Sequence, residues 1–420
     1  MTTAPAKPPV TAPSIQRRTL AVLSSAQITG GVGVAVGLAL SSVVVDELSG
    51  SVVISGFAGT ATVLGAALLA LPIARAAAGT GGRRAGLGLA YLAALAGCLI
   101  SVVAITITSW PLLLAGLVLV GGGSAGNLAA RYSATDLSPP GHAARHLSLV
   151  VWAATIGSVA GPNLADPADR IGRELGLVGT AGPFAFAALA FAAALLIIMA
   201  GLRPDPLVLA RSVDGVAAVK PGKHRTMRDG WATLRDTPVA RRALIAIAVS
   251  HTAMVSVMSM TPVHLRHEGA ELEVIGLVIS LHIAGMYVLS PVVGWLADKV
   301  GRVPVLVLGM ALLLAASVMA GTAGEHRVGQ VTAGLVLLGV GWSCGLVAGS
   351  AMLSEAVPIE RRPAVQGLSD LLMNVCGATG TVVAGAIVGG LSYGFLGMAV
   401  GVLVTVTGVW LTLTWRLRSS

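Results

Sequence analysis

Charged residues are scarce in this chain of 420 amino acids. Asp, Glu, Lys and Arg make up 11% of the sequence, whereas the hydrophobic types make up 55%. A soluble globular protein carries roughly 25% charged residues, so too few charges are present here to cover a water-facing surface. The scarcity excludes an ordinary soluble protein and indicates that most of the surface contacts lipid.

Cysteine is also rare, and enzymatic motifs are missing. Cys98, Cys344 and Cys376 all lie in apolar segments, where an odd number of thiols forms no disulfide framework, and the sequence leaves their role open beyond packing. No nucleophile–base pair, phosphate-binding loop or closed set of metal ligands is visible, so we expect neither an enzyme nor a resident cofactor. The net charge of +9 does not indicate nucleic-acid binding, because the basic residues form short groups between apolar segments.

Long apolar segments and many small residues are what the sequence does contain. A membrane-spanning helix needs about 20 mostly apolar residues, and glycine, with 54 residues, lets helices in a membrane bundle approach closely. We therefore predict an all-α membrane protein with twelve spans, at 20–44, 52–74, 85–108, 110–130, 147–165, 179–201, 242–264, 273–297, 303–321, 328–352, 364–389 and 391–415.

The spans fall into two groups of six, and these set the predicted domains. Residues 19–201 form an N-terminal six-helix bundle and residues 242–415 a C-terminal one. The polar segment 202–241 is expected to be a cytoplasmic linker. Residues 1–18, rich in Pro and Ala, are expected to be a disordered cytoplasmic tail, and residues 416–420 a second short tail.

The basic residues predict the orientation of these spans. With both termini on one side, that side holds 23 of the 27 Lys and Arg residues, and the other holds four. Cytoplasmic loops carry such an excess of Lys and Arg. We therefore expect a multi-pass protein of the cytoplasmic (inner) membrane, monomeric, with both termini and the linker in the cytoplasm.

The two halves repeat with a constant offset of about 219 residues. The shift superposes identical or similar residues at the ends of corresponding spans, namely Pro72 on Pro291, Gly82 on Gly301, Arg83 on Arg302, Gly126 on Gly345, Asp136 on Glu355, Pro139 on Pro358 and Gly161 on Gly380. A duplicated bundle places a solute site between its halves near the middle of the bilayer. We expect Asp136 and Glu355 to make equivalent helix-end contacts with basic residues and not to carry protons.

The segment Gly294-Trp-Leu-Ala-Asp298-Lys-Val-Gly301-Arg302 follows the eighth span. It resembles the signature loop of the major facilitator superfamily, and the resemblance extends over the whole chain. It implies two pseudo-symmetric six-helix bundles that transport a solute by alternating access. Gly294 and Gly301 then provide close packing and a tight turn, while Asp298, with Arg302, latches the cytoplasmic side by binding helix N-termini or a cation. The first half has Gly79 at the position of the aspartate, so we expect the second half to carry the latch.

Methionine and histidine form a pattern on the seventh and eighth spans. Met254 and Met258 are four residues apart, as are His282 and Met286, and His251 precedes Met254 by three. Such spacings place each group on one helix face. No span contains a clear mid-membrane Lys or Arg, which argues against a dedicated anion site. Thioether and imidazole ligands suit copper.

These paired motifs resemble those of the CcoA-like copper importers, a branch of the same superfamily. The resemblance implies that Met254, Met258, His282 and Met286 handle the metal, with His251 as a further candidate. The transported substrate would then be copper, free or chelated, passing along a ladder of weak ligands that lines the cavity between the halves.

A second function remains open at this point. The segment Gly157-Ser-Val-Ala-Gly161-Pro162 resembles a glycine–proline element of proton-coupled exporters, which would imply efflux of a drug or small metabolite. The residues after Pro162 depart from that pattern. A receptor or scaffold is disfavoured because the loops are too short to form a signalling domain.

Overall fold

The computed structural model describes residues 12–214, 226–324 and 327–419, and within these ranges its regular structure is entirely helical. Twelve segments are long and apolar enough to cross a membrane. This confirms the predicted fold class and the number of spans. Several spans are composite, since kinks divide the first span into α1 and α2 and the eighth into α12 and α13.

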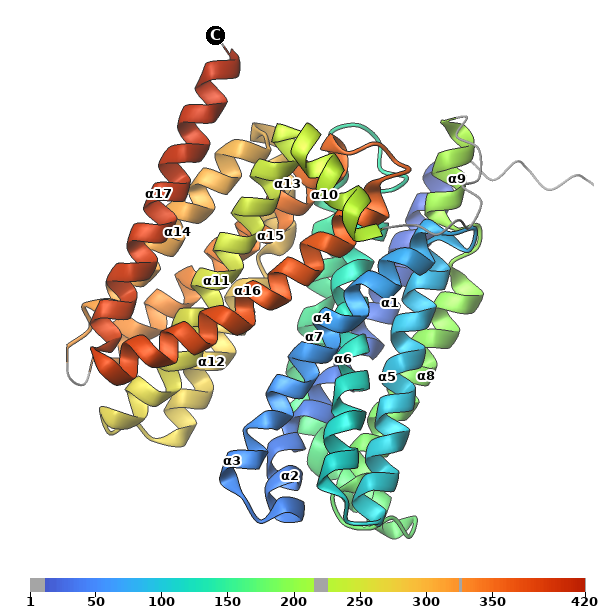
Figure 1. Cartoon of the computed structure of the whole chain (residues 1–420), viewed down its shortest axis with the longest axis vertical. Coiled ribbons are helices and arrows are strands. Elements are labelled where there is room, and N and C mark those ends of the chain that lie inside the picture. The colour runs from blue at the N-terminus through green and yellow to red at the C-terminus, as the bar shows by residue number, and fades with distance from the viewer. Residues whose placement is uncertain (1–11, 215–225, 325–326, 420) are drawn as a thin grey trace, which may run out of the picture.

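The first six spans form one bundle (Figure 1). Its helices are α1 (Ala12–Ala39), α2 (Ser41–Ser49), α3 (Val52–Ser55), α4 (Phe57–Ala78), α5 (Gly82–Thr106), α6 (Trp110–Ser133), α7 (Ala143–Glu174) and α8 (Ala181–Gly201). The second bundle consists of α11 (Pro238–His267), α12 (Leu272–Tyr287), α13 (Ser290–Val300), α14 (Arg302–Gly321), α15 (Val328–Ala356), α16 (Arg362–Gly390) and α17 (Tyr393–Ser419).

The predicted tails and linker are more helical than expected. Residues 12–18 belong to α1 and residues 416–419 to α17, because each terminal helix extends beyond its apolar stretch. The linker contains α9 (Pro206–Val213), whose N-terminus is capped by the Asp205 carboxylate, and α10 (Thr226–Asp236). Residues 1–11, 215–225 and 420 lie outside the described part of the chain.

Glycine allows the helices of each bundle to touch through their backbones. A Cβ atom at Gly97 on α5 would lie 2.6 Å from the carbonyl oxygen of Gly116 on α6. No side chain fits at that distance, so the close contact between these two helices requires glycine at this position. The abundance of small residues is thus explained by packing, as expected for helices in lipid.

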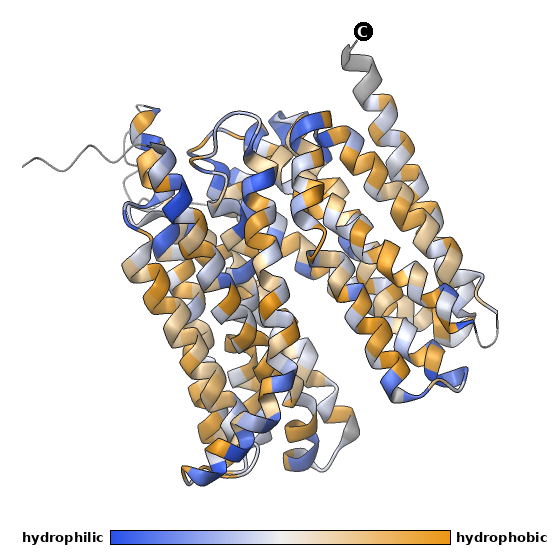
Figure 2. Ribbon diagram, turned by 180° about the vertical axis from the view of Figure 1, so that it is seen from behind, coloured by the Kyte–Doolittle hydropathy of each residue, from blue (hydrophilic) through white to orange (hydrophobic). Residues whose placement is uncertain are grey.

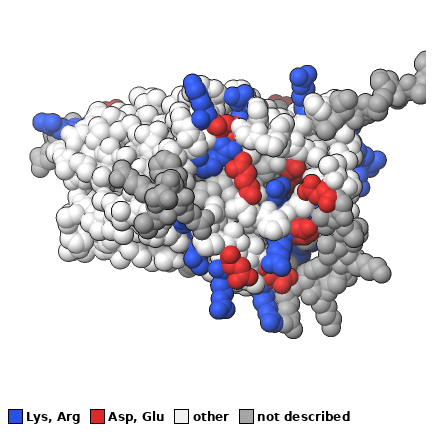
Figure 3. All heavy atoms as spheres, turned by 90° about the horizontal axis from the view of Figure 1, so that it is seen from above, with Lys and Arg blue, Asp and Glu red and all other residues white. Residues whose placement is uncertain are grey.

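The two bundles meet at one end of the molecule and diverge toward the other (Figure 1). The end where they meet also carries the start of α1, the end of α17, and the helices α9 and α10. We call it the terminal side, and the opposite end the distal side. Hydrophilic residues concentrate at both ends, while hydrophobic residues dominate between them (Figure 2). Seen from the terminal side, Lys, Arg, Asp and Glu cluster over the junction of the bundles (Figure 3).

Candidate transport site and terminal-side latch

A cavity of about 280 Å³ lies between the two bundles. Both halves contribute to its wall. Its polar and aromatic residues are Gln27, Ser124, Asn127, Arg131 and Ser158 from the first half and His251, Tyr287, Trp342 and Asn374 from the second. A cavity at the interface of two repeats is where the duplicated architecture places a solute site.

One wall of the cavity is aromatic and fixed by a hydrogen bond. The indole Nε1–H of Trp342 donates to Nδ1 of His251 at 3.1 Å. Because Nδ1 accepts this bond, a neutral His251 carries its proton on Nε2. Tyr287 meets the Trp342 ring edge-on, with centroids 5.8 Å apart. The three side chains hold one another in place, so they form a rigid surface for a solute.

The structure places the four predicted metal-handling residues in different surroundings. Met254 and Met286 line the cavity, and so does the further candidate His251. Met258 packs, half-buried, against the core of the second bundle. The side chain of His282 is fully buried, and its Nδ1 lies 2.8 Å from the carbonyl oxygen of Leu335 on α15.

Two of the four residues of the predicted ladder therefore lie at the cavity, and their role in handling a metal stays a prediction. Met258 and His282 are not among the described residues that line the cavity. Helical spacing shows which residues share a face, but the packing of α12 against α15 decides which neighbour that face meets. In the described ranges no three His, Cys, Asp or Glu side chains are grouped so as to hold a metal ion.

Sequence reasoning missed a buried ion pair beside the cavity. Arg131 on α6 and Asp370 on α16 join the two halves, with Nη2 and Oδ1 2.7 Å apart. The prediction that no span contains a clear mid-membrane Lys or Arg is not contradicted by Arg131, because this residue lies in the last turn of α6, which extends to Ser133. Asp370 was the available signal, since an ionisable residue well inside an apolar segment indicates a functional position.

The Asp298 latch binds the start of a helix in the other half. Its carboxylate oxygens accept hydrogen bonds from the backbone N–H groups of Ala144 at 3.1 Å and Arg145 at 2.9 Å, in the first turn of α7. It also pairs with Arg302 at 2.7 Å. A carboxylate at a helix N-terminus is stabilised by the helix dipole and the unpaired N–H groups. These contacts join the halves on the terminal side.

The two glycines of the signature segment have different roles. A Cβ atom at Gly294 on α13 would lie 2.7 Å from the carbonyl oxygen of Ala144 on α7. Gly301 has a φ of 101° between α13 and α14, a conformation that side chains disfavour. Gly294 therefore permits the crossing of the two halves, and Gly301 permits the turn that places Arg302 beside Asp298.

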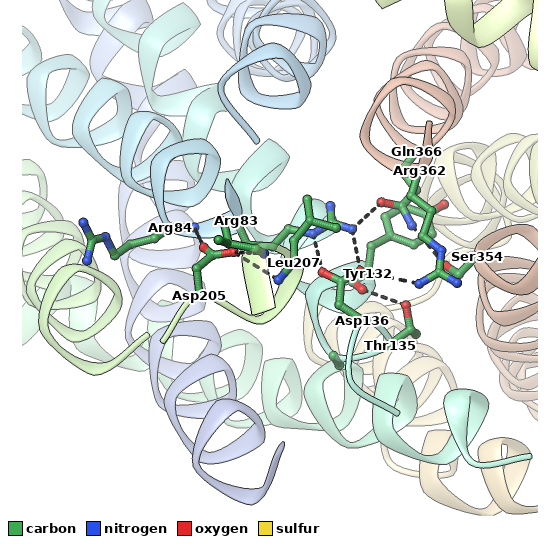
Figure 4. A network of polar contacts seen from close by, with 12 residues as sticks. Arg83, Arg84, Tyr132, Thr135, Asp136, Asp205, Leu207, Ser354, Arg362 and Gln366 are labelled. Atoms are coloured by element: carbon green, nitrogen blue, oxygen red, sulfur yellow. Dashed lines mark hydrogen bonds and ion pairs between the residues drawn. The ribbon is translucent and has the colours of Figure 1, made fainter. Parts of the chain in front are cut away.

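Equivalent ion pairs occur in the two halves, as predicted for Asp136 and Glu355. Arg83 donates to Asp136 at 2.7 and 3.0 Å, and Arg302 donates to Glu355 at 3.1 and 2.7 Å. The first-half copy differs, because Arg83 also donates to Gln366 of the second half at 2.7 Å (Figure 4). The first half has Gly79 at the position of the latch aspartate and therefore no latch carboxylate. In this half Arg83 makes the contact with the other half instead.

Asp136→Asn is expected to lower stability far more than Glu355→Gln. The Asp136 side chain is fully buried, so its loss leaves Arg83 an uncompensated buried charge, at a cost of about 3–5 kcal/mol. Glu355 is 40% exposed, and exposed pairs contribute ~1 kcal/mol or less. Thermal unfolding of both purified variants in detergent measures the difference. Equal losses of melting temperature would contradict the expectation that the buried Arg83–Asp136 pair contributes more to stability than the exposed Arg302–Glu355 pair.

Comparison with known proteins identifies the family. The sequence profile of the Major Facilitator Superfamily matches residues 20–273 and 243–420. The chain belongs to this superfamily, and it is a secondary transporter that acts on a small solute within the bilayer, not an enzyme.

Among curated relatives, the chain is 36% identical to the uncharacterized MFS-type transporter YdeG of Bacillus subtilis over 391 residues, covering 93% of this chain and 90% of that one. It is 25% identical to the riboflavin transporter RfnT of Brucella anthropi over 357 residues, covering 85% of each.

Solved structures share the fold. The human organic anion transporter MFSD10 (TETRAN) has a TM-score of 0.77 at 16% identity, with 96% of this chain and 100% of that one covered. A bacterial homologue of the iron transporter ferroportin, in its outward-facing state, has a TM-score of 0.71 at 16% identity, with 96% and 99% covered. At these identities the likeness shows the architecture alone.

Proposed function

We propose that the protein transports a small, planar organic solute with hydrogen-bonding edges. The observation that carries this proposal is the composition of the central cavity, where the aromatic rings of Trp342 and Tyr287 and the side-chain amides of Asn127 and Asn374 line the wall. Ligand cavities have volumes of roughly 300–1,000 Å³, so about 280 Å³ suits a small organic molecule. A bare metal ion needs far less space.

Riboflavin is the first solute to test. The relative RfnT is a riboflavin transporter. A flavin ring has apolar faces, which favour stacking on aromatic side chains, and an edge of amide-like donors and acceptors. The side chains of Gln27, Asn127 and Asn374 offer matching groups, and the Nε2–H of His251 is a further donor.

Copper import, suggested by the sequence, is the second candidate. Its support is that the thioethers of Met254 and Met286 and the imidazole of His251 line one cavity. It is the weaker candidate because His282 is directed to the carbonyl oxygen of Leu335 instead. Nothing among the described contacts favours the glycine–proline element of α7 as a sign of efflux, so the direction of transport is left to experiment.

Transport proceeds by alternating access in this proposal. The hydrogen bonds and ion pairs between the halves, including Asp298 to Ala144 and Arg83 to Gln366, lie on the terminal side. The structure therefore corresponds to a state closed on that side, with the bundles apart on the distal side (Figure 1). Opening the terminal side requires these contacts to break.

We further propose that the terminal side faces the cytoplasm. The basic residues cluster there, and 23 of the 27 fall on that side of the predicted spans, as the positive-inside rule requires. A cysteine introduced at Pro140 is expected to react with membrane-impermeant maleimide only in inside-out vesicles. Labelling of intact cells at that site would reverse the orientation.

Trp342→Ala is expected to reduce riboflavin movement into or out of proteoliposomes at least tenfold, because the stacking surface and the bond to His251 are both lost. Trp152→Ala is the matched control, since Trp152 is 41% exposed on α7 and outside the cavity. Copper content is measured in cells expressing the same proteins. Copper accumulation that depends on Met254 and Met286, without riboflavin movement, would favour the second candidate and contradict the first.

A further inference from the structure

Arg131 and Asp370 form an ion pair within the closed contact between the halves. Their side chains are 1% and 5% exposed. Arg131 belongs to α6 of the first bundle and Asp370 to α16 of the second. Any movement that separates the bundles on the terminal side must break this pair, and separating a buried pair leaves unpaired charges in a poorly solvated place.

The pair stands between two cavities. Arg131 lines the central cavity, as does Asn374, one helical turn from Asp370. Asp370 lines a smaller cavity of about 20 Å³, together with Arg83, Tyr132 and Gln366. This volume suffices for one water molecule beside polar groups. The ion pair therefore separates the solute cavity from a wettable space on the terminal side.

Arg131 and Asp370 differ in how many of their hydrogen-bonding atoms have a partner. Besides Asp370, the Arg131 guanidinium donates to the Ser350 hydroxyl at 3.1 Å, the Leu128 carbonyl at 2.8 Å and the Tyr132 hydroxyl at 3.3 Å. Asp370 uses Oδ1 for Arg131, while its Oδ2 accepts no hydrogen bond within the described part of the chain. Arginine does not lose its proton in proteins. Asp370 is thus the member whose charge can change.

We propose that Asp370 is the proton-coupling residue of this transporter, which assumes that the protein is a solute transporter as argued above. A proton entering from the central cavity binds Oδ2 and converts the carboxylate to a neutral carboxylic acid. Arg131 stays protonated and keeps its bonds to Leu128 and Tyr132 within the first half. The ion-pair attraction between the halves is lost, so the weaker bonds that remain between them, including Arg131 to Ser350, break more readily. The terminal side then opens, and the proton leaves through the small cavity.

The surroundings of Asp370 leave few other groups to explain a response to pH. Among described residues, Arg131 and Tyr132 come from α6 and Arg83 from α5. Arg83 is already paired with Asp136. On α11, His251 faces Arg131, but its Nδ1 is occupied by the Trp342 N–H. The residues of α15 in contact with this network, Ser350 and Ser354, are neutral.

The test follows opening of the terminal side without any solute, so its outcome is independent of the proposed substrate. Spin labels are placed at cysteines replacing Pro140 and Glu360, which are exposed on opposite halves of the terminal side, in a Cys376→Ser background. Distances are measured by electron double resonance in lipid nanodiscs between pH 8 and pH 5. In the wild type, the ratio of open to closed protein is expected to rise with acidity, by up to about tenfold per pH unit for one coupled proton.

In Asp370→Asn the ratio is expected to be high and independent of pH. Asp298→Asn is the control, because it weakens the latch but leaves Asp370 in place; it should open more readily and keep its pH response. Arg131→Lys, which preserves the charge, should shift the midpoint of the response and serves if Asp370→Asn does not fold. A wild-type pH response in Asp370→Asn, or an unshifted midpoint in Arg131→Lys, would overturn the proposal.

Discussion

Gly294→Val is expected to abolish transport while leaving each bundle folded. A Cβ atom at this position would lie 2.7 Å from the carbonyl oxygen of Ala144 and would overlap the hydroxyl of Ser148. Because a backbone carbonyl cannot rotate away, α13 and α7 must separate. Asp298 then loses its hydrogen bonds to the backbone N–H groups in the first turn of α7. The protein can no longer reach the state that is closed on the terminal side.

The control is Gly276→Val on α12, where an added Cβ would meet no atom within 4 Å. Replacing glycine by valine changes the helix propensity similarly at both sites. A difference in transport between the two variants therefore reflects only the close crossing of α13 and α7 at Gly294. Transport in proteoliposomes and the distance between labels on the terminal side are measured together. Normal transport by Gly294→Val would show that the two halves do not need to meet this closely.

Asp298→Asn is expected to slow transport at least tenfold with little change in solute affinity. The carboxylate binds two backbone N–H groups and pairs with Arg302, and its side chain is 5% exposed. An amide keeps only one acceptor oxygen and no charge. Losing charge-assisted bonds of this kind costs about 2 kcal/mol, which changes the closed-to-open ratio roughly thirtyfold.

Solute affinity is expected to stay the same because Asp298 does not line the cavity. The matched control is Asp166→Asn, which removes a carboxylate from the exposed Asp166–Arg170 pair on α7. Such a pair contributes ~1 kcal/mol or less. Initial rates and equilibrium binding are compared in the two variants. A loss of binding with an unchanged rate in Asp298→Asn would place this residue in the solute site and not in the latch.

The sequence was most informative where one physical requirement acts on many residues at once. Crossing lipid demands about 20 apolar residues per helix, and that demand produced the twelve spans in the right order. The repeat of 219 residues correctly paired Asp136 with Glu355. The same repeat places Arg131 opposite Ser350, and these two residues contact each other where the halves meet.

Residue-level roles were harder to predict because they depend on neighbours from distant segments. Met254, Met286 and His251 could be assigned to one helix face each, and they do line the cavity. His282 shares a face with Met286 by spacing, yet it lies against Leu335. A helix about 10 Å wide meets several partners, so four-residue spacing does not decide which of them a side chain contacts.

The sequence by itself determined the membrane location, the number of spans, the duplication and the signature segment, because these follow from hydropathy and from local residue order. Only the tertiary structure decided that Arg131 pairs with Asp370, that Arg83 reaches Gln366, and that Trp342 orients His251. Each of these contacts joins side chains about 90 or more positions apart. Their distances depend on how the helices rotate and cross, which composition and spacing along one helix do not specify.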